Sequence, residues 1–487
     1  MNLQTIAKTV ALAGFALIAG FVACQRPMAP APAAPKSNAS LAVEDIPTDS
    51  DYPADSNVLI GMIDQGDRRA MREHAWHLWA GLTAPSREVV DGQPIPVFET
   101  WYSIPEVFDD FYRNNPDARR RISHPTELPR QSFHIRNLTG ENRISPVMSF
   151  VKFNRSAAQF IWDKKYYERK TLDDLNKSFD GGDTPNERRE ISPFPKESVA
   201  LKVVFWLIKN GSSPQSQSGL TALPYWDPAY SPPLNNDLPT HDSWSKCVAV
   251  DPEQRYASGS IATINCNGNS IQAEVMHLDR FYSYKLASAE DVDDASRFLK
   301  MVSGASGKEE RMVSNDGQTP ELGDHIVLTA MHVTTKEMDN WTFQTFWWTP
   351  FPDLPPGGDF RTDNVRGQFR NYQMCTAYDM VTPRAADGSP AICFNPYLET
   401  DLGPTKSYVL GDQTFPPDPM AGTRSNCMTC HARAGYPAFG EPGSRSANFG
   451  RVFNEGYIRP DDHIFDGLTK TDFLWSIALQ AQPRPPK

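Results

Sequence analysis

Residues 198–209 read Ser-Val-Ala-Leu-Lys-Val-Val-Phe-Trp-Leu-Ile-Lys, a run of Val, Leu, Phe, Trp and Ile that is apolar on both faces of an extended chain. Such a run predicts a buried strand. Residues 324–335 and 340–349 are rich in aromatic and β-branched side chains, which predicts a pair of strands. The core of the fold should therefore be a sheet.

Helical spacing of apolar residues predicts helices between and after these strands. Residues 67–83 carry Met71, Ala75, Leu78 and Leu82 at this spacing. A last helix is expected over residues 468–480, with Thr469 as its cap and Asp472 in its first turn. Because strands and helices do not alternate in βαβ order, we predict an α+β fold: a large mixed domain followed by a short, mainly helical segment packed against it.

The composition bounds the class of protein. The chain has 487 residues, with 39% hydrophobic and 22% charged residues, enough to bury a large core. Lys and Arg number 48 and Asp and Glu 59, a formal net charge of −11. An acidic chain without a concentrated basic patch is a poor nucleic-acid binder, so we expect no nucleic-acid partner.

The N-terminus predicts export. The apolar run of residues 10–23 is about 14 residues long, which is short for a membrane-spanning helix of ~20 residues and typical of a signal peptide. Residues 21–24, Phe-Val-Ala-Cys, resemble a lipoprotein cleavage box, which predicts lipidation of Cys24 and anchoring to the outer membrane on the periplasmic side. The alternative is a nearby cut that leaves a soluble periplasmic protein. The expected organisation is a signal over 1–24, a Pro/Ala-rich linker over 25–57, an α+β domain over 58–400 and a C-terminal segment over 401–487.

Four further cysteines predict disulfides, because an exported chain folds in an oxidising compartment. Three pairings of Cys247, Cys266, Cys375 and Cys393 are possible. The local pairing, Cys247 with Cys266 and Cys375 with Cys393, closes two short loops of similar length. Each bridge would stabilise the fold by ~3 kcal/mol in the loop-entropy model. Four free thiols are the alternative.

One motif carries chemistry: Cys427-Met428-Thr429-Cys430-His431, the C-x-x-C-H pattern. Two thiols one helical turn apart can each add to a haem vinyl group, and the next residue can offer its imidazole to the iron. Chance gives roughly 0.002 such matches in a chain of this composition. A thioredoxin-like redox pair would need a βαβ context, and a structural zinc would need four ligands. The motif thus predicts one covalently bound haem c, with His431 as the proximal iron ligand.

The same residues support a family resemblance. Residues 425–431, Ser-Asn-Cys-Met-Thr-Cys-His, are similar to the haem-attachment site of c-type cytochromes. With residues 328–333, Leu-Thr-Ala-Met-His-Val, and 341–346, Trp-Thr-Phe-Gln-Thr-Phe, the chain resembles large exported bacterial cytochrome c-family proteins that have a single C-x-x-C-H site. The resemblance implies haem and export and no particular substrate.

The sixth iron ligand departs from the usual pattern, since none of the 56 residues after His431 is a methionine. Strand alternation over 324–335 places Ile326, Leu328, Ala330 and His332 on one face, so His332 is a candidate distal ligand, with a hydrogen-bonded core histidine as the alternative. His463 follows two aspartates that could orient its ring, so it is a second candidate, or else a loop histidine. His74 and His77 are weaker candidates. An open site is the remaining possibility.

These features predict an exported monohaem cytochrome that passes single electrons to redox partner proteins of the envelope. A haem enzyme of peroxidase or oxidase type, with His332 as distal acid/base, is the first alternative, supported by the bulk of the upstream chain. A haem-based redox or ligand sensor is the second. The chain holds no Walker loop, H-E-x-x-H, G-x-S-x-G or G-x-G-x-x-G pattern.

Overall fold

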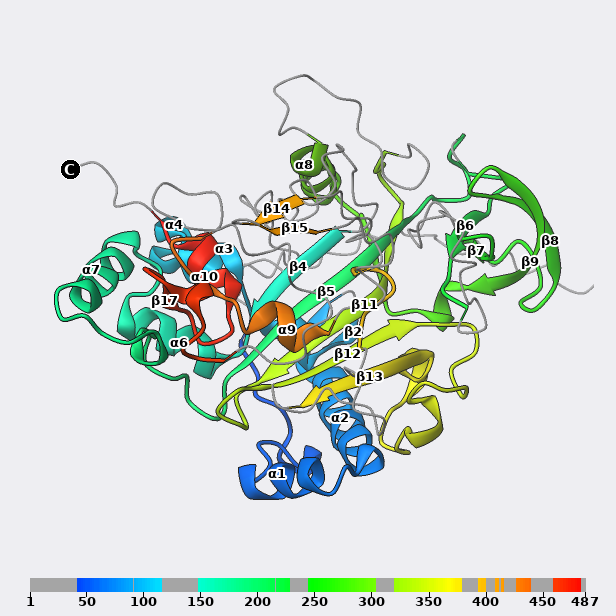
Figure 1. Ribbon diagram of the computed structural model, residues 1–487. Coiled ribbons are helices and arrows are strands. Elements are labelled where there is room, and N and C mark those ends of the chain that lie inside the picture. Colours follow the sequence, from blue (N-terminus) through cyan, green and yellow to red (C-terminus); the bar gives the residue numbers. More distant parts are fainter. Residues whose placement is uncertain are drawn as a thin grey trace, which may run out of the picture. The chain divides into compact units, whose positions relative to one another are not determined.

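A seven-stranded antiparallel sheet forms the centre of the computed structural model (Figure 1). Its strand order is β13-β12-β11-β5-β4-β3, with β10 also paired to β11. The strands are β3 (Tyr102–Ser103), β4 (Met148–Phe153), β5 (Val199–Ile208), β10 (Ser283–Lys285), β11 (His325–Thr335), β12 (Thr342–Trp348) and β13 (Tyr372–Tyr378). The buried strand over 198–209 and the pair over 324–349 are thus confirmed, and the fold is α+β.

The structure describes residues 42–90, 92–115, 148–214, 216–227, 244–303, 319–378, 393–399, 408–410, 413–415, 426–438 and 459–482. Cys24, its signal and the Pro/Ala-rich stretch lie outside these residues. Among the described residues, no helix combines the length and the apolar character needed to cross a membrane.

The packed chain begins earlier than predicted. Val43 and Ile46 are buried in the main core, and the indole N–H of Trp101 donates to the carbonyl of Glu44 at 2.8 Å. The prediction of a linker up to residue 57 is therefore wrong for residues 42–57, because apolar side chains of this segment pack in the core with residues of the sheet. Helix α1 (Ser56–Asp64) follows directly.

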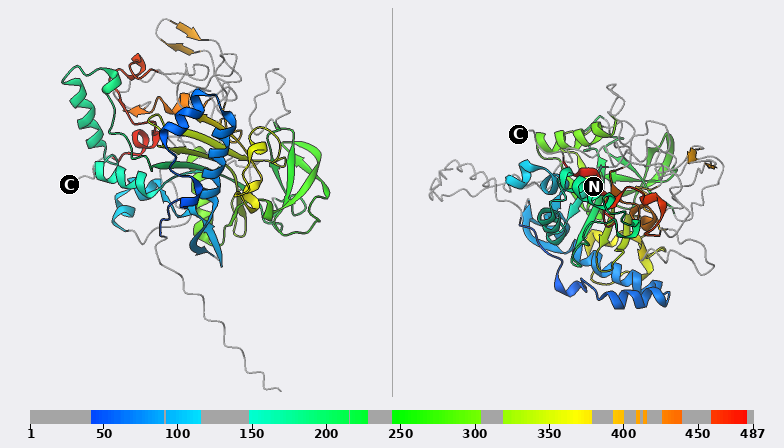
Figure 2. Two further views of the ribbon diagram at one scale, coloured as in Figure 1. Left: turned by 90° about the horizontal axis from the view of Figure 1, so that it is seen from below. Right: turned by 60° about the vertical axis from the view of Figure 1, so that its left-hand side comes forward.

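Helix α2 (Arg68–Thr83) covers one face of the sheet, hereafter the α2 face (Figure 2). The Asp67 carboxylate accepts from the Ala70 N–H and caps the helix. The ring of Trp79 stacks on Phe346 of β12 with centroids 4.3 Å apart and contacts Tyr372 of β13 at 4.9 Å. These aromatic contacts fix α2 across the strands.

Strand β11 contains a β-bulge that overturns one prediction. Leu328 pairs with Phe205 of β5, whereas Ala330 pairs with the adjacent Val204, so one residue is inserted between them. An inserted residue shifts the alternation of side chains by one. Ala330 and His332 therefore face away from Leu328. The predicted shared face of Ile326, Leu328, Ala330 and His332 is wrong, because alternation along one strand does not reveal a bulge.

A smaller sheet has the order β6-β7-β9-β8, with β7 parallel to β9. Its strands are β6 (Thr221–Pro224), β7 (Cys247–Asp251), β8 (Ile261–Cys266) and β9 (Asn269–His277). A disulfide joins Cys247 to Cys266, and a second joins Cys375 to Cys393. The local pairing predicted from loop lengths is confirmed.

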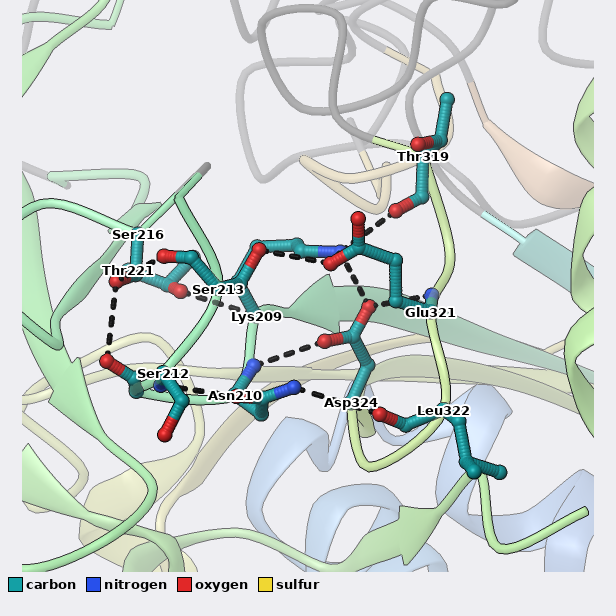
Figure 3. Close-up of polar contacts among 11 residues, drawn as sticks. Lys209, Asn210, Ser212, Ser213, Ser216, Thr221, Thr319, Glu321, Leu322 and Asp324 are labelled. Carbon is teal, nitrogen blue, oxygen red and sulfur yellow. Dashed lines mark hydrogen bonds and ion pairs between the residues drawn. The ribbon is translucent and has the colours of Figure 1, made fainter.

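A buried charge cluster ties β5 to the start of β11 (Figure 3). The Lys209 ammonium donates to one oxygen of Asp324 at 2.5 Å and to the carbonyl of Thr319 at 2.6 Å. The other Asp324 oxygen accepts from the Asn210 N–H at 2.8 Å. Lys209 and Asp324 are both fully buried, and each charge meets its partner, so the cluster locks this end of the strand pair.

The tail shares a core with earlier helices. Residues of α3 (Ile104–Phe108), α6 (Arg155–Lys164), α7 (Arg169–Asp180), α9 (Cys427–His431) and α10 (Trp475–Gln480) meet in one apolar cluster. β16 (Gly435–Tyr436) pairs with β17 (Thr469–Lys470), so the described tail is not only helical. Packing of the tail against the main body is as expected. The remaining elements are α4 (Asp110–Asn114), α8 (Ala289–Ser303), β1 (Pro85–Val90), β2 (Gln93–Pro96), β14 (Tyr408–Leu410) and β15 (Gln413–Phe415).

The single helix predicted over 468–480 is wrong in its first half. Residues 469–470 form β17, and α10 begins only at Trp475. Between them, Asp472 and Phe473 have φ values of 46° and 66°, which a right-handed helix excludes. Local pattern favours a helix here, and contacts with distant segments override it.

Candidate functional site

Helix α9 presents the C-x-x-C-H motif on one turn. The Asn426 side chain accepts from the Met428 N–H at 3.0 Å and caps the helix. Cys427 and Cys430 are three residues apart, which places their thiols on the same side of the turn. Neither thiol is in a disulfide. The local fold thus presents both sulfurs together, as attachment of a single haem requires.

The two thiols are poor candidates for a redox-active pair. Burial raises the pKa of the Cys430 thiol to about 11 and the pKa of the Cys427 thiol well above its usual value. Reactive cysteines have lowered pKa values, because the thiolate is the nucleophile. These thiols stay protonated near neutral pH, which weakens the thioredoxin-like alternative.

The imidazole of His431 is held in one tautomer. Its Nδ1 lies 2.8 Å from the carbonyl oxygen of Phe473, and a carbonyl can only accept, so Nδ1 carries the proton. Burial lowers the pKa of His431 to about 4, with a smaller contribution from the charges of His332 and Lys202. The ring is therefore neutral at pH 7. Its Nε2 keeps a lone pair, as an axial ligand to iron needs.

Helix α9 lies over the sheet face opposite α2, hereafter the α9 face (Figure 1). The centroid of the His431 ring is 4.8 Å from that of Phe343 on β12. Because alternate residues of a strand point to opposite faces, Phe343 and Phe346 serve different faces of β12. The same alternation, carried across the register of β12 with β11, places His332 on the face of Phe343. The bulge in β11 is thus what brings His332 to the side of His431.

His332 stands in a group of charged side chains. Its Nε2 lies 2.8 Å from a carboxylate oxygen of Glu399, and both side chains are mostly buried. Lys202 pairs with His332 in the register of β5 and β11, and burial lowers its pKa. The charges of His332, Lys202 and Glu399 all act on the pKa of His431. The structure therefore brings His332 and His431 into one site.

The other candidate histidines lie elsewhere. His463 begins a short 3-10 helix (His463–Phe465), its side chain is 97% exposed, and it pairs with Asp466 at 3.4 Å. His74 is buried on the α2 side, where its Nδ1 lies 2.6 Å from the Tyr378 hydroxyl. His77 pairs with Asp51. His332, which lies on the α9 face, is therefore the candidate that the fold places at the motif.

Three residues of the site were not predicted: Phe473, Glu399 and Lys202. Lys202 had a visible signal, since it is the one charge inside the apolar run 199–208. Glu399 and Phe473 had none, because their roles depend on contacts with segments far along the chain. The Cys375–Cys393 disulfide lies beside the motif, which the sequence did not predict. The carbonyl oxygen of Cys393 lies 3.6 Å from the Cys427 sulfur, and Cys393 forms an isolated β-bridge with Asn426. The disulfide thus ties the motif to β13.

The donor set fits a haem better than a zinc ion. In the described ranges, no three or more His, Cys, Asp or Glu side chains gather as ligands for a metal ion. A structural zinc needs four such ligands, whereas haem c needs two thiols and one or two axial groups. Comparison with protein-family models, with curated proteins and with solved structures found no match.

Proposed function

We propose that this chain is an exported monohaem c-type cytochrome that passes single electrons between partner proteins of the bacterial envelope. The observation that carries the proposal is the state of His431: within the C-x-x-C-H turn, its Nδ1–H donates to Phe473 and its Nε2 is left to bind iron. Cys427 and Cys430 would hold the haem through thioether bonds. When bound, the haem supplies a one-electron Fe(II)/Fe(III) couple.

His332 is the distal ligand that the contacts favour. It lies on the α9 face, and its charge acts on His431. Glu399 beside it could accept the N–H of a coordinated ring, which is how carboxylates commonly orient ligating histidines. A haem with two imidazole ligands has a lower potential than one with a methionine ligand.

One observation favours a second candidate, a haem enzyme with an open distal position. The His332–Glu399 pair and the nearby Lys202 are titratable groups that could move protons beside the iron. In that case Glu399 would orient His332 as an acid/base, and His332 would not bind the metal.

Spectra of the purified protein in both redox states separate these two functions. We expect a low-spin ferric haem that binds neither CO nor cyanide, because two imidazoles fill both axial positions. A control with an established open-site haem protein should bind both ligands under the same conditions. A high-spin ferric signal with ready CO binding would instead favour the enzyme.

The two disulfides indicate an oxidising, exported compartment. We propose in addition that the protein is a periplasmic lipoprotein anchored through Cys24 to the outer membrane. A Cys24→Ala variant should then leave the membrane fraction or remain unprocessed, because the acylated cysteine is gone. Cell fractionation with a Cys247→Ala, Cys266→Ala control measures this. Wild-type processing and fractionation of the Cys24→Ala protein would contradict lipidation.

A further inference from the structure

The turn that contacts His431 has a strained backbone. The Leu474 N–H donates to the Thr471 carbonyl at 3.0 Å, and both central residues, Asp472 and Phe473, have positive φ. These are features of a type I′ turn, which usually takes glycine or asparagine at both positions. Other residues hold this conformation only at a cost in free energy. Such strain persists only where the surroundings hold it.

The Asp472 carboxylate is held by hydrogen bonds from three donors, two side chains and one backbone N–H. One of its oxygens accepts from the Lys336 ammonium at 2.7 Å and from the Trp341 indole N–H at 3.1 Å. The other accepts from the Phe194 N–H at 2.9 Å. Asp472 is 3% exposed, so these bonds act in a buried setting where they are strong. Lys336 and Trp341 flank the β11–β12 connection, and Phe194 precedes β5.

The strained turn then acts on the motif through one atom. The Phe473 carbonyl accepts the Nδ1–H of His431 at 2.8 Å. The Thr471 N–H also donates to Ala434, just after the motif, at 2.9 Å. The direction of the Phe473 carbonyl follows from the turn, and the turn is held by Asp472.

We propose that Asp472 is a positioning residue for His431: the Lys336–Asp472–Trp341 brace holds the Phe473 carbonyl where it fixes the imidazole tautomer and strengthens the hydrogen bond to the iron ligand. The inference rests on the proposed function, since it assigns the residue that tunes the same haem. A stronger bond to Nδ1–H makes the ligand more basic and stabilises Fe(III) over Fe(II). The brace therefore lowers the reduction potential.

The variant Asp472→Asn tests this. An isosteric amide must turn its NH₂ toward either Phe194 N–H or the Lys336 and Trp341 donors, so a donor faces a donor and the turn loosens. We expect the electron-exchange equilibrium constant with a reference couple to change about threefold to tenfold toward Fe(II), an upward shift of about 30–60 mV for a one-electron couple. Redox titration of the holoprotein measures it.

Asp324→Asn is the matched control. Asp324 has a similar set of donors: a lysine and a backbone N–H, in place of the indole N–H, on one oxygen, and a backbone N–H on the other. It stands at the opposite end of β11, roughly 35 Å along the strand from Lys336. Both variants should lower thermal stability, but only Asp472→Asn should move the potential. If the two variants lose stability alike and neither moves the potential, Asp472 is merely structural.

Two further measurements keep the test decisive. If Asp472→Asn does not fold, the milder Trp341→Phe removes one donor only and should give a smaller upward shift; no shift would overturn the proposal. In a haem-free protein with Cys427→Ser and Cys430→Ser, ¹⁵N histidine NMR should show His431 as the Nδ1–H tautomer, and adding Asp472→Asn should mix the tautomers. An unchanged tautomer would contradict the proposed role of Asp472. Because this measurement uses haem-free protein, it does not depend on whether the haem assignment is correct.

Discussion

A protein in which Cys427 and Cys430 are both replaced by serine is expected to carry no haem after acid-acetone extraction. Serine hydroxyls do not add to haem vinyl groups, so both covalent bonds are lost. His431 alone would leave a haem that organic acid removes. Expression must include haem-maturation machinery, and the measurement is the absorbance that remains with the protein after extraction.

The control for this double variant is Cys247→Ser with Cys266→Ser. It also removes two cysteines, but from the smaller sheet rather than from α9. It should lose ~3 kcal/mol of stability from a loop of 19 residues and keep the whole haem signal. Covalent haem retained in the Cys427/Cys430 variant would end the assignment of the motif.

The sheet could be predicted from the sequence because its signals are local. The apolar run in β5 and the aromatic residues of β12 predict buried strands from their own sequence, without knowledge of the strands that they pair with. The bulge between Leu328 and Ala330 could not be predicted, since it exists only in the pairing with β5. This one residue decides that His332 faces the motif rather than α2.

The same division holds at the site. Cys427, Cys430 and His431 are recognisable because haem attachment demands a fixed local spacing. Their partners come from elsewhere in the chain: the Phe473 carbonyl from 42 residues downstream, and Glu399 beside His332 from another segment. At Asp472 the local pattern predicts a helix, but the chain forms a turn. Three donors from distant segments bind the Asp472 carboxylate and hold this turn.

Replacing His332 by alanine is expected to convert a low-spin ferric haem to a high-spin one that binds CO once reduced. Of the four candidate histidines, His332 is the one on the α9 face beside the motif, so its loss should open the distal position. EPR and optical spectra record the change. His463→Ala is the matched control, because that side chain is 97% exposed and should leave the spectra as they are.

Alanine also removes the partner of one Glu399 oxygen, while the other oxygen still accepts from the Asn395 N–H, so the variant changes packing as well as ligation. His332→Met separates ligation from packing, since a thioether can bind the iron. This variant should stay low-spin with a higher potential, as expected of a haem with one histidine and one methionine. If both His332 variants keep the wild-type spectrum, His332 is not the ligand. The next residue to replace is then Lys202, which pairs with His332 across β5 and β11, rather than His74, whose ring is held by Tyr378 and Glu337 on the α2 side.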